Sequence, residues 1–430
     1  MARGPVGSHG TSPYASPASN LSSSLAWTWH NPAGRFRDFS NGAVLVDDMM
    51  NLYVGFGSGI RKFSVDGKVL WHFLPGGAWN DIPALWAGAV YLTLQSGHVV
   101  AVDMESGKLR WKSAQACTWK SSTKNKVHPD CNCATIGQDI GAVAAYNGVV
   151  VAKAHEPPGG GACRAVGLNA STGEFLWDYA AEHLIWNFYP IINDDGKSFL
   201  FQDSTGGAYH LGLDGTELWK AGIEPQAFKE TYTDGGLQLG PNGVAYAVKA
   251  AGDNVGPGTV RAFRVADGAF LWESPPMPYP PNSWPVVGRL RESDRLTVMA
   301  PVGLCGMAPF GKPMTAEVWG LDAETGELLW TWAAPPWYWG LYRGERERIF
   351  HGNSICLPNP NGNPTLDASG NLYIGMLDGF IYRLAPDRES PGVRVPSSFD
   401  AQAAFSNGGT SIAPGLMAIA SCDTLFVFRD

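Results

Sequence analysis

The chain has 430 residues, of which 45% are hydrophobic and only 16% are charged. A chain this long and apolar can bury a sizeable core, which excludes a disordered protein and a small disulfide scaffold. The formal net charge is -8 and no basic run occurs, which argues against nucleic acid as a partner. No stretch reaches the roughly 18 consecutive apolar residues of a membrane span, so we expect a soluble chain.

The first 24 residues are rich in Gly, Pro and Ser and lack the apolar core of a signal peptide. We predict an irregular leader over 1–24, followed by a single domain over 25–430. The segment 25–29 (LAWTW) alternates like an isolated β-strand. The compartment stays open at this stage.

Internal repetition is the strongest signal in the chain. Six segments share an apolar residue, an Asp or Asn, a turn containing Gly, and a closing Trp. They are 64–71 (SVDGKVLW), 102–111 (VDMESGKLRW), 168–177 (LNASTGEFLW), 212–219 (GLDGTELW), 264–272 (RVADGAFLW) and 321–330 (LDAETGELLW). The closing Trp residues are 40, 66, 42, 53 and 58 positions apart. Spacings of roughly 40–50 residues are typical of β-propeller blades, and the longer ones indicate loop insertions.

The pattern inside each repeat is that of β-strands. Residues 90–94 alternate, Ser96 and Gly97 are suited to a hairpin turn, and 99–102 predict the next strand. Helical periodicity is nearly absent. Four short antiparallel strands cannot cover both of their faces, so neighbouring units must stack and close a ring.

Counting the repeats predicts eight blades, with seven as the alternative. The Trp-terminated units supply six blades, and 352–400 supplies a seventh without a closing Trp. The segment 409–430 contains three predicted strands and lacks a fourth. If the N-terminal strand at 25–29 completes that sheet, the ring closes without an open edge.

The repeat ends resemble the pyrroloquinoline-quinone (PQQ) repeat, whose pattern is roughly A-x-D-x-x-T-G-x-x-x-W. Ala101, Asp103, Ser106, Gly107 and Trp111 match it with Ser in place of Thr, and the copies ending at Trp177 and Trp330 match with other substitutions. The resemblance implies a quinoprotein alcohol dehydrogenase-like propeller over about residues 25–430. We expect a structural role between blades for the closing tryptophans, which are Trp71, Trp111, Trp177, Trp219, Trp272 and Trp330.

The quinoprotein alcohol dehydrogenases hold PQQ between a Trp and an adjacent Cys-Cys disulfide, beside a Ca²⁺ ion and a catalytic Asp. This sequence has no Cys-Cys pair, and the nearest equivalent is Cys131-Asn132-Cys133. We therefore expect no cofactor, with PQQ and Ca²⁺ as the alternative. The resemblance favours a secretory or periplasmic-type compartment, and it also extends to non-catalytic scaffold subunits of assembly machines.

The insertion 117–137 contains the one candidate metal site of the sequence. Cys117, His128, Cys131 and Cys133 offer three sulfurs and an imidazole, which suit Zn²⁺. A disulfide of Cys117 with Cys131 or Cys133, or free thiols, are alternatives that the sequence leaves open.

Two Pro-rich aromatic clusters follow repeat tryptophans. One contains Tyr279 and Trp284, and the other contains Trp337, Tyr338 and Trp339. Either they cover blade edges, or they form a rim that binds a partner or a sugar ring. The charges that alternate over 343–348 are typical of a solvated face.

These patterns predict a non-catalytic propeller that binds protein partners in a larger assembly. A PQQ-dependent redox enzyme or quinone binder is one alternative. A propeller that binds or acts on carbohydrate, with a glycan or small-molecule ligand at the rim, is the other.

Overall fold

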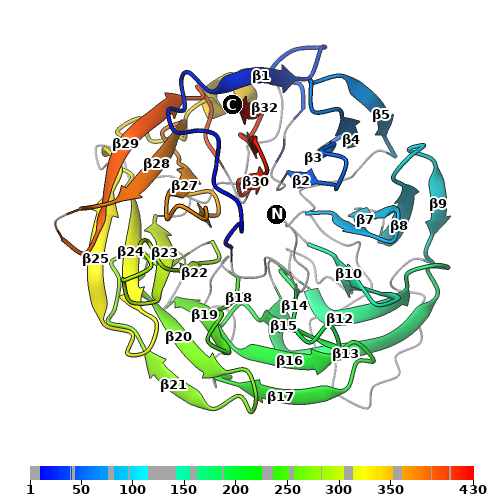
Figure 1. The fold of residues 1–430 in the computed structure, drawn as a ribbon. Helices are drawn as coiled ribbons and strands as arrows, with labels where there is room; N and C mark the ends of the chain where they lie inside the picture. The colour runs from blue at the N-terminus through cyan, green and yellow to red at the C-terminus, as the bar shows by residue number, and fades with distance from the viewer. Residues whose placement is uncertain are drawn as a thin grey trace.

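Eight four-stranded antiparallel sheets, arranged as the blades of a propeller, account for nearly all regular structure in the described residues (Figure 1). The structure is a computed structural model. It describes residues 10–38, 40, 44–75, 82–94, 97–114, 142–154, 162–185, 188–224, 236–250, 256–281, 283–304, 313–351, 361–388, 390–405 and 408–430. Within these ranges the single helix is Glu345–Phe350 (α1).

Blades 1 to 4 are each built from four consecutive strands. Blade 1 contains Leu45–Val46 (β2), Leu52–Phe56 (β3), Gly59–Phe63 (β4) and Val69–Phe73 (β5). Blade 2 contains Ala84–Trp86 (β6), Ala89–Leu94 (β7), His98–Asp103 (β8) and Leu109–Lys112 (β9). Blade 3 contains Ala144–Tyr146 (β10), Val149–Ala154 (β11), Ala162–Asn169 (β12) and Phe175–Ile185 (β13). Blade 4 contains Ile191–Ile192 (β14), Ser198–Gln202 (β15), Ala208–Gly212 (β16) and Glu217–Ala221 (β17).

Blades 5 to 7 follow the same plan. Blade 5 contains Gln238–Leu239 (β18), Val244–Ala250 (β19), Gly258–Arg264 (β20) and Phe270–Glu273 (β21). Blade 6 contains Val286–Gly288 (β22), Thr297–Gly303 (β23), Ala316–Asp322 (β24) and Leu328–Ala333 (β25). Blade 7 contains Thr365–Leu366 (β26), Leu372–Gly375 (β27), Phe380–Pro386 (β28) and Val393–Asp400 (β29).

Blade 8 joins the two ends of the chain. Three of its strands are Ser411–Ala413 (β30), Leu416–Ala420 (β31) and Thr424–Arg429 (β32), and the fourth is Leu25–His30 (β1). β1 pairs with β32 in antiparallel register, with Thr28 opposite Phe426 and Trp29 opposite Leu425. Figure 1 shows β1 beside β32 on the outer side of the ring. The prediction of eight blades closed by the N-terminal strand is confirmed, and the seven-blade alternative is wrong.

The antiparallel order of strands gives the ring two distinct faces. The turns after the first and third strands of each blade lie on one face, which we call the AB/CD face. The turns after the second strand and the connections to the next blade lie on the other, the BC/DA face.

The hydrophobic core runs as layers between neighbouring blades. The second and third strands of a blade are buried on both sides, as in β7, where all six residues are buried. One such layer combines Tyr53 of blade 1 with Val90 and Val100 of blade 2. The outer strands are half exposed because only one of their faces meets another blade, which explains their alternating pattern in the sequence.

The described part of the leader, residues 10–24, contains no helix or strand and crosses the AB/CD face. Pro17, Ala18 and Leu21 are buried, with Ala18 and Leu21 in an apolar cluster formed by blades 7 and 8. Residues 10–14 reach the ring axis and pair with β26 through the bridge between Thr11 and Leu366. We call residues 10–15 the leader tip and residues 17–21 the leader anchor.

Candidate functional site

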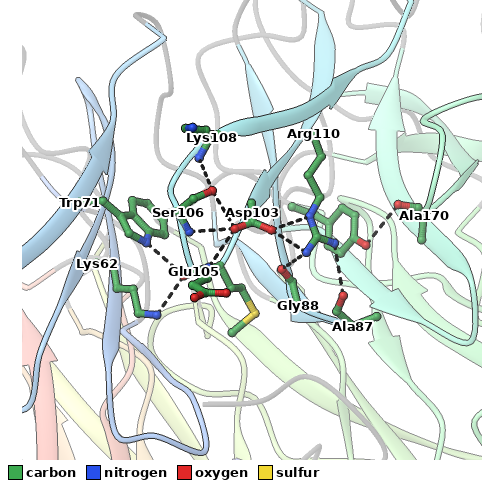
Figure 2. Close-up of polar contacts among 12 residues, drawn as sticks. Lys62, Trp71, Ala87, Gly88, Asp103, Glu105, Ser106, Lys108, Arg110 and Ala170 are labelled. Atoms are coloured by element: carbon green, nitrogen blue, oxygen red, sulfur yellow. Dashed lines mark hydrogen bonds and ion pairs between the residues drawn. The ribbon is translucent and has the colours of Figure 1, made fainter.

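The repeat motif forms the joint between adjacent blades (Figure 2). At the joint of blades 1 and 2, the Trp71 indole donates to the Met104 carbonyl over 3.0 Å, and the Lys62 ammonium donates to the same oxygen over 2.9 Å. Asp103 accepts from the Ser106 amide at 2.8 Å and from the Arg110 guanidinium at 2.8 Å. The Ser106 amide first, and then Arg110, hold the pKa of the Asp103 carboxyl well below its usual range. These groups are mutually satisfied, so the joint is a structural unit.

The same contact recurs around the ring. An indole N–H of one blade donates to a turn carbonyl of the next: Trp27 to Val65, Trp71 to Met104, Trp111 to Ala170, Trp177 to Leu213, Trp219 to Val265 and Trp272 to Ala323, over 2.7–3.2 Å. Trp330 lies against Gly392 of blade 7. Trp27 occupies the corresponding place in blade 8, a role that the sequence analysis did not assign because its motif lies apart from the repeats.

Aromatic side chains fill the ring axis on the BC/DA side. Tyr189 and Trp284 meet edge to face with ring centroids 4.8 Å apart, and they form one cluster with Ile82 and Ala142. Because these residues precede the inner strands of blades 2, 3, 4 and 6, they can meet only near the axis. Trp284 is fully buried, so of the two alternatives for its cluster this residue takes a packing position and does not lie on an exposed rim.

A cavity of about 450 Å³ opens at the axis on the AB/CD side. The leader tip forms one wall, and the inner strands and first turns of blades 1 and 8 form the others. Asp47, Asp48 and the buried residue Thr410 are among the residues that line the cavity. No sequence pattern indicates this cavity, because the leader and the two blades are far apart along the chain.

The aromatic insertion that follows β25 lies on the BC/DA face. Tyr338 is 67% exposed and Trp339 is 76% exposed. Trp337 is half-buried, and its indole donates to the Leu341 carbonyl over 2.7 Å. Tyr279, from the other predicted cluster, is half-buried against the cores of blades 5 and 6. Of the five predicted rim aromatics, the structure therefore exposes only the adjacent pair Tyr338 and Trp339.

Helix α1 adds two large apolar side chains to the same insertion. Ile349 is 49% exposed and Phe350 is 86% exposed. We call Tyr338, Trp339, Ile349 and Phe350 together the exposed apolar segment. The sequence analysis did not identify Ile349 and Phe350, because the alternating charges of residues 343–348 indicated a solvated polar segment.

The interpretation of residues 343–348 as a solvated face is wrong for two of its members. Glu345 and Arg348 are 2% and 1% exposed. They lie 3.7 Å apart, and Arg348 also donates to the Cys422 carbonyl over 3.0 Å. Because they are three residues apart, both lie on the buried side of α1. Burial lowers the pKa of the Arg348 guanidinium. Their burial anchors the insertion against blade 8.

The cysteine insertion and its proposed ligands, Cys117, His128, Cys131 and Cys133, lie outside the described residues. Within the described ranges, no group of three or more His, Cys, Asp or Glu side chains comes together as a metal site. Cys422, in the BC/DA turn of blade 8, is disulfide-bonded.

At the BC/DA end of the axis, the contact between the Tyr189 and Trp284 rings leaves no slot between them for a planar quinone. The quinone would need an open slot beside an aromatic ring, with oxygen ligands for a cation nearby. Here the rings of Tyr189 and Trp284 contact each other, and the leader tip lies at the opposite end of the channel.

Comparison with known proteins finds similarity to other repeat propellers. The family model described as "Outer membrane protein assembly factor BamB", PQQ_2, matches residues 34–123 and 57–234. The chain is a PQQ-repeat, quinoprotein-like β-propeller. This PQQ-repeat propeller is also 23% identical, over 371 residues, to the dehydrogenase subunit of an alcohol dehydrogenase (quinone) from Gluconobacter oxydans. The match covers 73% of this chain and 45% of the relative, so the propeller spans less than half the length of that protein.

Solved structures share the fold of the PQQ-repeat propeller at low sequence identity. BamB from Moraxella catarrhalis superposes with a TM-score of 0.61 at 13% identity, covering 94% of this chain and 97% of that one. Quinohemoprotein alcohol dehydrogenase from Comamonas testosteroni superposes with a TM-score of 0.65 at 12% identity, covering 97% and 78%. Similarity at this level of identity establishes the fold, whereas the function has to be argued from the residues of the site. In the part of the propeller that the structure describes, no helix is long and apolar enough to cross a membrane.

Proposed function

We propose that this PQQ-repeat propeller is a non-catalytic scaffold that binds a protein partner through the exposed apolar segment on its BC/DA face. Four large apolar side chains are exposed at 49–86% within residues 338–350, and such a group marks an interaction site more often than apolar side chains exposed singly do. Trp and Tyr are also enriched where proteins bind one another, because they bury much area with few rotatable bonds.

The buried ion pair of α1 supports this proposal. Glu345 and Arg348 hold the helix on blade 8 while Ile349 and Phe350 point away from the core. A helix that is anchored by its polar residues and exposes its apolar ones is arranged for contact with another molecule. The match to a BamB family model is consistent with such a role.

Site-specific photocrosslinking tests the proposal in the intact protein. A photoreactive phenylalanine analogue replaces Trp339, Phe350 or, as the matched control, Phe270 on the outer strand β21, which is 58% exposed. We expect the analogue at 339 and 350 to capture one and the same protein, and the analogue at 270 to capture none of it. Trp339→Ser and Phe350→Ser should then abolish co-purification of that protein. Equal capture from all three positions would refute the proposal.

The compartment that we propose is an oxidising one of the periplasmic type. A disulfide at Cys422 supports it, since cytosolic thiols are kept reduced. Alkylation of the protein from cells, before and after reduction, tests this. Labelling of Cys422 before reduction would contradict it.

A quinone-dependent oxidoreductase is the second candidate, favoured by the 23% identity to the Gluconobacter oxydans subunit. Incubation with PQQ and Ca²⁺, followed by assay of dye reduction with alcohols, distinguishes the two. We expect no retained chromophore and no dye reduction. A stoichiometric chromophore with alcohol-dependent reduction would replace the scaffold proposal by this one.

A further inference from the structure

The leader tip occupies the channel mouth mainly through main-chain contacts. The Leu366 amide donates to the Gly10 carbonyl over 3.1 Å, and the Ser12 amide donates to the Leu366 carbonyl over 2.8 Å. The Ala368 amide donates to the Tyr14 carbonyl over 3.1 Å. The bonds to Leu366 form a parallel bridge between the tip and β26, and extended peptides bind exposed sheet edges by main-chain pairing of this kind.

Among the side chains of the tip, the Ser12 hydroxyl donates to the Ile412 carbonyl over 3.1 Å. Pro13, Tyr14 and Ala15 are exposed, whereas Ala18 and Leu21 of the leader anchor are fully buried. The tip can therefore leave the mouth while the anchor stays between blades 7 and 8. A competing extended peptide could make the same main-chain bonds.

One buried polar residue beside the cavity, Thr410, has a hydroxyl that the tip does not satisfy. Thr410 is fully buried, and its hydroxyl oxygen has no hydrogen-bond partner among the described residues. A hydroxyl buried without a partner loses its hydration without compensation, so it favours a ligand that supplies a donor or acceptor. The residue lines the 450 Å³ cavity, which has room for a long side chain.

The charge of the cavity wall determines which type of ligand side chain the cavity would bind. Asp47 lies 3.7 Å from the Lys62 ammonium and accepts from the Tyr53 hydroxyl over 2.8 Å. Asp48 is exposed and forms no ion pair within the described part of the chain. The wall therefore retains a net negative charge, which attracts a basic side chain.

We propose that this channel mouth binds an extended peptide of a partner protein, with a glycine at the place of Gly10 and a basic side chain in the cavity. In the absence of that peptide, the leader tip occupies its binding site. The glycine is required because φ is +71° at Gly10 and an added Cβ would lie 2.9 Å from Val286 Cγ2. The inference rests on the proposed function in that it assigns a second contact to a protein partner.

Peptide binding to the full-length protein tests this inference by fluorescence anisotropy. The probe is a labelled peptide of residues 10–16 carrying Ser12→Lys, and its matched control carries Ser12→Glu. Two variants of the protein release the tip: Gly10→Val, by the steric clash, and Ser12→Pro, by removal of the amide that donates to Leu366. Hydrogen exchange at Leu366 and Ala368 reports whether the tip has left.

We expect the lysine peptide to bind each released variant at least 10-fold more tightly than it binds the unchanged protein. On the released variants, it should also bind at least 10-fold more tightly than the glutamate peptide. Asp48→Asn should remove the preference for lysine. Thr410→Val should weaken binding at least 3-fold, whereas Thr424→Val, which also removes a buried hydroxyl without a partner but lies away from the cavity, should not.

Failure of the lysine peptide to bind the released variants would overturn the inference. Persistent protection of Leu366 and Ala368 in both variants would also overturn it, because the tip would then not be displaceable. Trp339 lies on the opposite face, so Trp339→Ser should leave the affinity for the lysine peptide unchanged. Absence of partner capture at Trp339 would therefore contradict the proposed function, and absence of peptide binding would contradict this inference.

Discussion

At each tryptophan joint, one indole of a blade lies over a turn glycine of the next. Gly173 has φ +76°, and a Cβ there would lie 2.4 Å from Trp111 Cε3. The indole of Trp111 donates to the Ala170 carbonyl over 2.9 Å at the same turn. The repeat therefore pairs Gly with Trp across the joint, since no larger residue fits under the ring.

Replacement of one joint indole should destabilise the ring without changing its fold. Because Trp111 is partly buried, we expect Trp111→Ala to lower the free energy of unfolding by about 2–4 kcal/mol, within the range for large aromatic truncations. Trp339→Ala, at an exposed indole, should change it by less than about 0.5 kcal/mol. Urea unfolding monitored by circular dichroism measures both, and equal effects would contradict the role assigned to the joint.

His210 should make the stability of blade 4 depend on pH. It is 5% exposed beside Trp219, and burial lowers its pKa from the usual 6.5, although the nearby Asp195 carboxylate opposes this. The folded state then binds the proton less readily than the unfolded state. The stabilisation from neutral His210 is complete above about pH 6.5 and is lost as the pH falls toward the lower folded pKa.

Thermal unfolding between pH 7 and pH 5 measures this effect. We expect His210→Leu to flatten the decline of the melting temperature in that window. His72→Leu, at an exposed position of β5, should leave the decline as it is. A decline that persists unchanged in His210→Leu would show that other groups cause it.

Among the elements, the joint between blades 7 and 8 differs from the other seven. β29 has no tryptophan, and blade 8 has no turn between its outer strands, because the two chain ends lie there. The leader anchor takes the place of the missing contact. Tyr373 donates to the Ala18 carbonyl over 3.4 Å, and Arg383 donates to the Ser19 carbonyl over 3.0 Å.

Truncation of the anchor should therefore open this joint. Leu21 is fully buried in a cluster with Tyr373 and Phe428, so we expect Leu21→Ala to cost about 2–5 kcal/mol of unfolding free energy. It should also speed proteolysis of the leader. Tyr14→Ala, in the half-exposed leader tip, should do neither, and a Leu21→Ala protein as stable and as protease-resistant as that control would refute the anchoring role.

At the level of the whole molecule, the sequence was informative wherever the repeat determined the structure. Blade number, strand positions and ring closure followed from the spacing of motifs such as those ending at Trp71 and Trp111, because each repeat fixes its own turn and its contact with the next. The buried pair Glu345 and Arg348 was misread, since a short helix inside a β-protein changes which charges share a face.

The candidate sites depend on contacts that no local pattern reveals. The channel-mouth cavity combines Thr11, Asp48 and Thr410, and the pair that fills the opposite end combines Tyr189 and Trp284. Such residues meet only after the ring has closed. Their distances in sequence exceed the range over which periodicity and motif spacing carry information.

The position of β1 in the last sheet also constrains how the protein is made. The ribosome synthesises Leu25–His30 before the strands of blades 1 to 7 and its partner Thr424–Arg429 after them. At about 5–20 residues per second, the roughly 400 residues between them take on the order of 20–80 s to emerge. Throughout that time the nascent strand presents Trp27, Trp29 and an unpaired edge, and a chaperone that shields it until β32 emerges would have a defined target.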